Sequence, residues 1–329
     1  MRIFDAHLDL AYNAVRGRAV EQSARSQTTD EEGIPTVGLP DLRAGGVDLV
    51  CATIFYPPGF ESKDGYQTPD EAHAEATRQL DWYRRQEQQN GTLRPVQHAA
   101  DLAEPQNLNA ILLLEGADPI RDDTDLENFW DAGLRIVGLA WKRTRYAGGT
   151  KMPGPLTPDG VKLVKKLDAR GVIHDTSHLA EESFWQLLEL AEGPVMASHS
   201  NCRAIVPTDR QLSDAMIRAV AARGGVIGIN FYEKFLLPPG EFGKRRATLA
   251  DVTLHVRHMC DLLGDATHVG LGTDMDGGFG RDEIPVAIET SADLPRVADA
   301  LAAGGFSDAD IHRIMSGNWL EFFKRSLPK

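Results

Sequence analysis

The sequence predicts a closed parallel (β/α)8 barrel, a TIM-type fold, and three observations support this class. Eight short runs rich in Val, Ile and Leu recur along the 329 residues. Segments of helical period separate most of these runs, which is the alternation that produces a parallel sheet. Acidic and imidazole side chains stand at the ends of several runs, where barrel enzymes build their sites. A doubly wound open sheet usually has fewer strands, so the barrel is the better interpretation.

The strands are predicted from apolar runs that often follow a glycine or a proline. Gly46-Val47 and Pro194-Val195 are examples, and each is typical of a helix that ends just before a buried strand begins. The predicted strands are Arg2–Asp9, Val47–Phe55, Ala110–Glu115, Leu134–Trp141, Val172–His178, Val195–His199, Val226–Phe231 and His268–Asp274.

Helices are predicted where apolar residues recur at spacings of three and four. These segments are Pro69–Gln89, Pro158–Arg170, Glu181–Glu192, Ser213–Arg223, Leu249–Leu263, Asp293–Ala303 and Asp308–Lys324. No low-complexity linker divides the chain, so we expect a single (β/α)8 barrel domain over residues 1–329. The long irregular stretches all follow predicted strands, and they are Tyr12–Leu39, Tyr56–Thr68, Tyr146–Pro158 and Tyr232–Arg246.

The composition is ordinary for a globular protein, with 42% hydrophobic and 25% charged residues. Lys and Arg number 35 against 48 Asp and Glu, so the net charge is -13. A chain this acidic, without a block of basic residues, is a poor candidate for binding nucleic acid or an anionic membrane. The three cysteines imply no disulfide framework, and no apolar run reaches the ~18 residues of a membrane span. We therefore expect a soluble cytoplasmic protein.

Side chains that can bind metal stand at the ends of five predicted strands, and they are His7, Asp9, Glu115, His178, His199 and Asp274. Alternation along a strand puts His7 and Asp9 on one face. Burying these groups together without a counter-ion would be costly. Imidazole and carboxylate without thiolate favour Zn²⁺, with Mn²⁺ or Co²⁺ as alternatives. The set exceeds what one tetrahedral ion needs, so we expect two ions about 3.5 Å apart, bridged by Glu115.

A series of short motifs runs through the chain from its first residues. In order they are Asp5-Ala6-His7-Leu8-Asp9-Leu10, Glu115-Gly116, Asp175-Thr176-Ser177-His178, Ser198-His199-Ser200, Asn230-Phe231-Tyr232 and Gly272-Thr273-Asp274-Met275-Asp276-Gly277. No single motif is specific, but the ordered set covers nearly the whole chain. In this order the motifs resemble the renal (membrane) dipeptidase family, zinc peptidases of the M19 type.

The resemblance implies a ligand set and a cofactor. His7 and Asp9 would hold the first zinc ion, His178 and His199 the second, and Glu115 would bridge the two. It therefore implies two Zn²⁺ ions per chain. Family members cleave dipeptides, often with a D-residue at the C-terminal position, and sometimes open β-lactams or related rings. The resemblance also suggests a homodimer.

The implied mechanism is hydrolysis by a hydroxide that bridges the two ions. Asp274 would take a proton from the bridging water and return it to the leaving amine. Arg210, eleven residues after His199, would bind the free carboxylate of the substrate. Trp141 and Tyr232 would contact the substrate.

Two positions depart from the family pattern. Ala6 replaces a glycine beside the ligands. Leu139-Ala140-Trp141 stands where characterised members have Leu-Thr-His, and that histidine is thought to bind the scissile carbonyl. Trp141 keeps open two alternatives: a barrel hydrolase for lactones or N-acyl amino acids, and a metal-binding relative that has lost catalysis. Other barrel hydrolases commonly use a modified lysine, and Lys142 follows the predicted fourth strand.

Simpler interpretations exist for several polar residues. His174 shares a predicted strand with His178 but lies deeper, so we expect a hydrogen-bonded core histidine. Asp276 is expected to cap the loop after Asp274. Taken alone, His178 or His199 would also be interpreted as a core imidazole. The ordered set of motifs is what favours metal binding.

Overall fold

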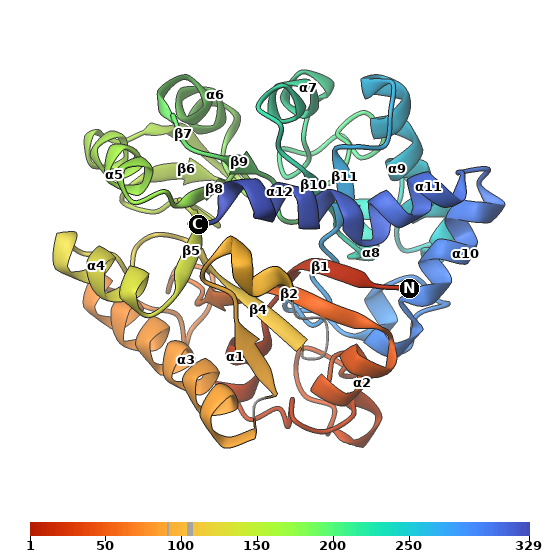
Figure 1. Ribbon diagram of the computed structural model, residues 1–329, viewed down its shortest axis with the longest axis horizontal. Coiled ribbons are helices and arrows are strands. Elements are labelled where there is room, and N and C mark those ends of the chain that lie inside the picture. Colours follow the sequence, from red (N-terminus) through yellow and green to blue (C-terminus); the bar gives the residue numbers. More distant parts are fainter. Residues whose placement is uncertain (91, 104–107) are drawn as a thin grey trace.

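The strands of the central sheet follow one another around a ring in sequence order (Figure 1). The computed structural model describes residues 1–90, 92–103 and 108–329. Neighbouring strands of the ring are parallel. The ring strands are β1 (Ile3–Leu8), β2 (Val47–Phe55), β4 (Leu108–Glu115), β5 (Leu134–Gly138), β8 (Ile173–Asp175), β9 (Val195–Met196), β10 (Ile227–Ile229) and β11 (Val269–Leu271).

A parallel bridge between Ala197 and Ile227 joins β9 to β10 and closes the ring. The Gly228 N–H donates to the Ala197 carbonyl oxygen at 2.8 Å. Glycine is needed at Gly228 and Gly272, because a Cβ atom on either would lie within 1.9 Å of the Ser198 carbonyl oxygen. The eight-stranded barrel predicted from the sequence is confirmed.

Apolar side chains fill the ring, and the last helix, α12 (Asn318–Ser326), covers one of its ends. Phe4, near the start of β1, stacks on Phe323 with ring centroids 5.2 Å apart. Trp319 Nε1 donates to the Leu271 carbonyl oxygen at 2.9 Å. These aromatic rings are buried with side chains of the ring interior, among them Leu49, Ile111, Ile136, Ile173 and Met196. The amino ends of the strands are thereby covered.

Five strands end two or three residues earlier than predicted: β5 stops before Trp141, β10 stops before Phe231, and three others stop before predicted metal-site residues. β8, β9 and β11 stop three residues before His178, His199 and Asp274 respectively. His178 has φ +66° and Asp274 has φ +59°, and a residue in this left-handed region does not continue a strand. The prediction that these residues end strands was therefore wrong: each lies in the turn that follows its strand.

The segment that carries His7 and Asp9 does not follow the simple alternation of a β-strand as far as Asp9. β1 ends at Leu8, and Asp9 is the residue before α1 (Leu10–Val15). The register of β1 against β2 also shifts between Asp5 and Leu8. Both predicted ligands are nevertheless buried together, with His7 Nε2 4.0 Å from Asp9 Oδ2.

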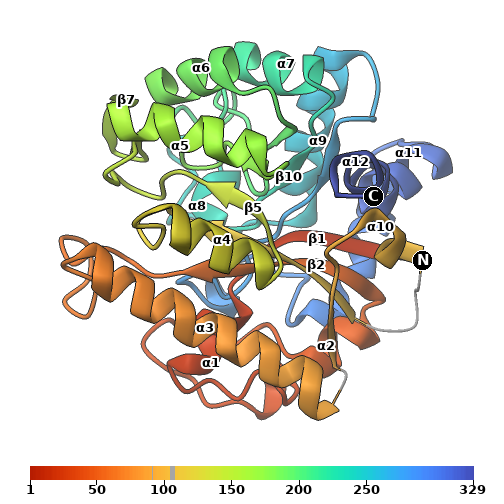
Figure 2. The ribbon, with the colours of Figure 1, turned by 60° about the vertical axis from the view of Figure 1, so that its left-hand side comes forward.

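Helices lie outside the ring, as Figures 1 and 2 show. The helix α9 (Leu249–Leu263) has the predicted bounds, because Thr248 and Asp251 form a capping box and Gly264 ends it at φ +85°. The closing helix predicted over Asp308–Lys324 is interrupted by a π-helical turn at Arg313–Gly317. The others are α2 (Leu39–Ala44), α3 (Pro69–Asn90), α4 (Asp123–Asp131), α5 (Pro158–Ala169), α6 (Glu181–Leu190), α7 (Asp214–Ala222), α8 (Glu233–Leu236), α10 (Pro295–Ala303) and α11 (Asp308–His312). Within the described ranges, no helix is long and apolar enough to cross a membrane.

A small hairpin occupies most of the stretch 146–158, which was predicted to be irregular. Its two strands pair antiparallel and are β6 (Ala147–Gly149) and β7 (Met152–Leu156). The turn of the hairpin carries Thr150, whose Oγ1 lies 3.0 Å from His178 Nδ1. One further strand pairs with β4 outside the ring, β3 (Leu93–Pro95).

Two buried histidines lie away from the predicted metal ligands. His174 is fully buried with Nε2 2.7 Å from Asp168 Oδ1, so it is a hydrogen-bonded core residue, as predicted. His255 on α9 accepts the Cys202 N–H at Nδ1 over 3.1 Å, and its Nε2 lies 3.2 Å from the Leu236 carbonyl oxygen. Burial lowers the pKa of His255 from 6.5 to about 4.

His255 should make the fold sensitive to acid. Because its pKa is 6.5 when unfolded and about 4 when folded, the unfolded chain binds more protons between these values. The contribution of the neutral His255 to the free energy of unfolding is therefore complete above pH ~6.5. It declines as the pH falls, and about 3 kcal/mol of it is lost at pH 4. In chemical denaturation at pH 7.5 and pH 4, His255→Gln should lose less stability than the wild type. The exposed His312→Gln is the control, and equal losses in all three proteins would contradict the assignment.

Candidate metal centre

A cleft of about 780 Å³ opens at the carboxyl ends of the barrel strands. Eight of the nine predicted site residues line it, and they are Asp9, Glu115, Trp141, His178, His199, Arg210, Tyr232 and Asp274. The ninth, His7, is 0% exposed and lies behind the cleft wall against Glu115. The structure therefore brings all nine predicted residues to one end of the barrel.

Glu115 ends β4, and its two carboxylate oxygens face different partners. Oε1 lies 3.2 Å from His178 Nε2 and 3.5 Å from His199 Nε2. Oε2 lies 3.6 Å from His7 Nε2. The side chain is 6% exposed, so water screens these contacts little. A carboxylate in this position can contribute one oxygen to each of two neighbouring cation sites.

A second group of ligand atoms surrounds His7. Asp9 Oδ2 is 4.0 Å and Asp274 Oδ1 is 3.9 Å from His7 Nε2. The ligand atoms of this trio lie within 4.8 Å of one another, as do those of Glu115, His178 and His199. The structure thus brings Asp274 as close to His7 as the predicted ligand Asp9, so by position Asp274 could bind metal or transfer a proton.

Several buried atoms at this site lack the partners that buried polar atoms normally have. Within the part of the chain that the structure describes, His7 Nε2, Asp9 Oδ1 and Glu115 Oε1 make no hydrogen bond. His178 Nε2 and His199 Nε2 lie only 2.9 Å apart, a distance at which two lone pairs repel unless a proton or a cation lies between them. Unpaired buried polar atoms are costly. The residues therefore fit a divalent cation, and imidazole with carboxylate is a donor set for Zn²⁺, Mn²⁺ or Co²⁺.

The electrostatics of the two groups differ. Burial alone lowers the pKa of His7, but the carboxylates of Glu115, Asp9 and Asp274 outweigh it and raise that pKa to about 10. At neutral pH the metal-free site therefore keeps a positive charge at the ring of His7. For His178 and His199, burial lowers the pKa well below its usual value, and the positive charges of Arg210 and His7 act in the same direction. These two rings are neutral, as a metal ligand must be.

Two of the site residues have backbone conformations that non-glycine residues rarely adopt. His178 and Asp274 both have φ near +60°, which costs on the order of 1–3 kcal/mol each. The turn at Asp274 also requires a glycine nearby, because a Cβ on Gly277 would lie 2.0 Å from Asp274 Oδ1. Such conformations persist only where the surroundings enforce them, and they cluster at functional sites.

Hydroxyl groups contact the outer nitrogens of the three imidazoles. Ser198 Oγ lies 2.7 Å from His199 Nδ1 and 3.2 Å from His7 Nδ1. Thr150 Oγ1 lies 3.0 Å from His178 Nδ1. Sequence reasoning did not identify either hydroxyl. Ser198 stood inside a quoted motif, whereas Thr150 lies in the hairpin and no pattern in the sequence points to it.

Arg210 is 4% exposed although it carries a charge. Its guanidinium donates to Ser200 Oγ at 3.0 Å and to the His199 carbonyl oxygen at 2.5 Å. Its Nε has no hydrogen-bond partner among the described residues. Asp209 and Asp214 are near Arg210 in the sequence, but the hydrogen bonds of the Arg210 side chain go to the segment that carries His199.

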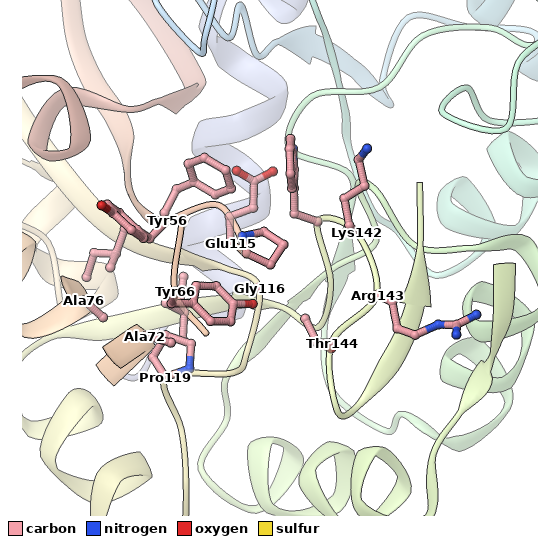
Figure 3. A pocket seen from close by; sticks show the side chains of 15 residues that line it. Tyr56, Tyr66, Ala72, Ala76, Glu115, Gly116, Pro119, Lys142, Arg143 and Thr144 are labelled. Carbon is pink, nitrogen blue, oxygen red and sulfur yellow. The ribbon is translucent and has the colours of Figure 1, made fainter. Parts of the chain in front are cut away.

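Trp141 separates the cleft from a smaller cavity of about 10 Å³, and both Trp141 and Glu115 line both spaces. That volume holds about one water molecule. Figure 3 shows the smaller cavity, with Glu115 and Lys142 extending to the same side and Ala72 and Pro119 on the opposite side. Lys142 Nζ pairs with Glu61 Oε1 at 2.6 Å.

Aromatic rings line two sides of the cleft. The ring of Trp141 meets Phe55 edge-on at 5.2 Å and lies 6.1 Å from the His178 ring. Tyr232 stacks on Phe279 with centroids 4.5 Å apart. Both Trp141 and Tyr232 are therefore placed where a ligand in the cleft would meet a flat apolar surface.

Comparison with known proteins gives a consistent result. Residues 1–326 match the model of the membrane dipeptidase family, peptidase family M19. A crystal structure of a metallopeptidase from Rhodobacter sphaeroides, bound to a phosphinate mimic of the dipeptide L-Ala-D-Ala, is 26% identical with a TM-score of 0.85, over 99% of both chains. A second crystal structure, of an M19 dipeptidase, is 27% identical with a TM-score of 0.84, over 100% of this chain and 99% of the other.

A sequence relative extends this picture. An uncharacterized protein from the pqqA 5′ region of Klebsiella pneumoniae is 32% identical over 247 residues, which are 71% of this chain and 89% of that protein. The family match covers nearly the whole chain, and the barrel and the buried imidazole–carboxylate cluster agree with it. The chain therefore belongs to the membrane dipeptidase family, peptidase family M19, and is a metal-dependent hydrolase of the dipeptidase type.

Proposed function

We propose that the chain hydrolyses dipeptides, including those with a C-terminal D-residue, with two Zn²⁺ ions bound in the mouth of the barrel. One observation carries the two-ion proposal: the oxygens of Glu115 face two separate groups, His7 on one side and His178 with His199 on the other. The dipeptide mimic bound to the Rhodobacter sphaeroides relative supports the substrate class.

In this proposal His7 and Asp9 hold one ion, His178 and His199 hold the other, and Glu115 is shared. When bound, such ions polarise the scissile carbonyl and make a water-derived nucleophile available at neutral pH. The side chains around them set where the substrate lies and where protons move.

Asp274 is the proposed proton carrier. Asn230 Nδ2 donates to Asp274 Oδ2 at 2.8 Å, which leaves Oδ1 on the side of His7. Before a cation binds, burial raises the pKa of Asp274 to about 7, against the opposing effect of His7. A carboxylate of this kind is suited to accept the proton of the attacking water and return it to the leaving amine.

Arg210 and Trp141 are proposed to hold the substrate. The free Nε of the buried guanidinium is a donor available to a carboxylate, which supports binding of the C-terminus of a dipeptide. Trp141 lies beside His178 and presents an indole where related enzymes have a histidine. Its N–H can donate one hydrogen bond but the ring cannot accept one, and its size narrows the cleft. We expect a preference for small or flat side chains.

Replacing Glu115 tests the shared ligand. Wild-type protein reconstituted with Zn²⁺ should contain about two ions per chain, and Glu115→Ala should lower the content of both sites, because the carboxylate contributes to each. Elemental analysis after gel filtration gives the count. Glu192→Ala removes an exposed carboxylate and should leave two ions. Loss of a single ion from Glu115→Ala would remove the residue from the bridging position.

Activity on dipeptides tests the function itself. A panel with L- or D-residues at the C-terminal position should be hydrolysed in the presence of Zn²⁺ and not after chelation. Asp274→Asn should lower kcat about 10²–10⁴-fold with normal metal content, and the exposed Asp299→Asn should not. Metal loss in Asp274→Asn would make the residue a ligand instead. A wild-type chain that cleaves lactones or N-acyl amino acids but no dipeptide would overturn the proposal.

Trp141 offers a gain-of-function test. If a histidine at this position donates to the developing oxyanion, Trp141→His should raise kcat/KM for ordinary dipeptides by about 10–10²-fold. Trp141→Ala should widen the range of accepted side chains without that gain, since alanine removes the bulk of the indole and supplies no hydrogen-bond donor. Equal rates for the wild type and Trp141→His would mean that the indole already supplies the donor or that none is needed.

A further inference from the structure

The hydroxyl of Ser198 is surrounded by three side chains that could each bind metal. Its Oγ lies 2.5 Å from Asp175 Oδ2, 2.7 Å from His199 Nδ1 and 3.2 Å from His7 Nδ1. His7, Asp175 and His199 also have ligand atoms within 4.8 Å of one another. The hydroxyl lies among these atoms and bonds to all three, so this trio is not a third cation site.

The direction of each hydrogen bond follows from what the groups can donate. A hydroxyl has one proton and two lone pairs, and a carboxylate can only accept. Asp175 Oδ1 already accepts the N–H groups of Ser177 at 3.0 Å and Ser198 at 2.9 Å. The short contact at Oδ2 therefore takes the hydroxyl proton of Ser198. The remaining neighbour, Ser177 Oγ, lies at the longer distance of 3.3 Å and is itself bonded to the His199 N–H.

With its proton given to Asp175, Ser198 has only lone pairs to offer the two imidazoles. His7 and His199 must then both donate from Nδ1–H. A proton on Nδ1 leaves Nε2 for metal. In the neutral ring of His199 the lone pair is then on Nε2, and in His7, which is charged before metal binds, the Nε2 proton is the one that metal would displace. In both residues Nε2 is the atom that faces Glu115. His7 lies on β1 and His199 lies in the turn after β9. One hydroxyl therefore orients ligands from two strands that are not neighbours in the ring.

We infer that Ser198 and Asp175 are positioning residues that fix the Nδ1–H tautomer of both His7 and His199 and so present both Nε2 atoms to metal. The inference rests on the proposed metal centre but is separate from the identity of the substrate. Partners of this kind at the outer nitrogen of a metal-binding histidine typically contribute 10–100-fold to metal affinity.

An isosteric substitution gives the sharpest test. In Asp175→Asn the two backbone N–H groups keep the amide oxygen at the Oδ1 position, so the amide nitrogen faces Ser198. The hydroxyl then accepts from Asn and can donate its proton to an imidazole, the nearer of its remaining neighbours, which would place the lone pair of that ring on the wrong nitrogen. Ser198→Ala removes the hydroxyl, so that neither imidazole is held in one tautomer by it. We expect Zn²⁺ affinity, measured by competition with a chromophoric chelator, to fall about 10–100-fold in Ser198→Ala and further in Asp175→Asn.

Two variants control for damage to the fold. Ser198→Thr keeps the hydroxyl and should retain most of the Zn²⁺ affinity. Ser316→Ala removes a buried hydroxyl from the π-helical turn and should bind Zn²⁺ as the wild type does. Thermal unfolding of each metal-free variant checks that the barrel is intact. Unchanged affinity in both Ser198→Ala and Asp175→Asn would overturn the inference.

A direct observation of the tautomers needs no variant and no activity. ¹⁵N NMR of histidine-labelled, metal-free protein should find the proton of His199 on Nδ1 in the wild type. A proton on Nε2 would overturn the inference whatever the affinities are. If the wild type binds no divalent ion, the proposed function fails, and this spectrum still decides the role of Ser198 and Asp175 independently.

Discussion

The arrangement at the mouth of the barrel depends on one buried carboxylate that lies among imidazoles from three separate segments. Glu115 is held at the end of β4, and its oxygens lie within 3.6 Å of His7, His178 and His199. A charge this deeply buried is stable only beside opposite charge or good donors. The strands β8 and β9 are short, His178 lies in a left-handed turn, and Gly228 and Gly272 allow the close approach of the Ser198 carbonyl oxygen. Together these features place imidazoles beside this carboxylate. The other contacts described at the carboxyl end of the barrel hold the side chains of this cluster in place.

The barrel could be predicted because its signals are local and repeated. β2 and α9 have the predicted bounds. β2 is apolar apart from Asp48 and Thr53, and α9 has a capping residue at one end and a glycine at the other. Errors arose where tertiary contacts override local pattern. The segment 172–178 begins with Val172 and Ile173 and continues into polar residues; the strand ends at Asp175, and His178 lies in a left-handed turn where its side chain contacts Glu115 and Thr150. The hairpin β6–β7 is rich in Gly and Pro, which are signals of loops.

Most of the site residues could be named from the sequence because they lie close to the ends of predicted strands in an ordered set of motifs, whereas Arg210 and Trp141 were named only through the family resemblance. The groups that orient the site residues could not be named in this way. Ser198 and His7 are separated by 191 residues, and Asn230 meets Asp274 across 44 residues. Contacts of this kind depend on which strands are neighbours and where each turn leaves its strand. Asp175 illustrates the limit: its motif was recognised, but its bonds to Ser198 appear only once β8 lies beside β9.

The position of the helix α12 affects how ligands reach and leave the metal-ligand cluster. With Trp319 and Phe323 packed over the amino ends of the strands, the ring ends blindly beneath His7, and the cleft at the carboxyl ends is where a ligand gains access to the cluster. Among the described residues, this cleft is where water, ions, substrate and both products would enter and leave. The order in which the two products leave then depends on how deep each lies in the cleft: the fragment nearer the opening leaves before the one beneath it. A tightly held outer fragment would therefore delay the release of the fragment beneath it.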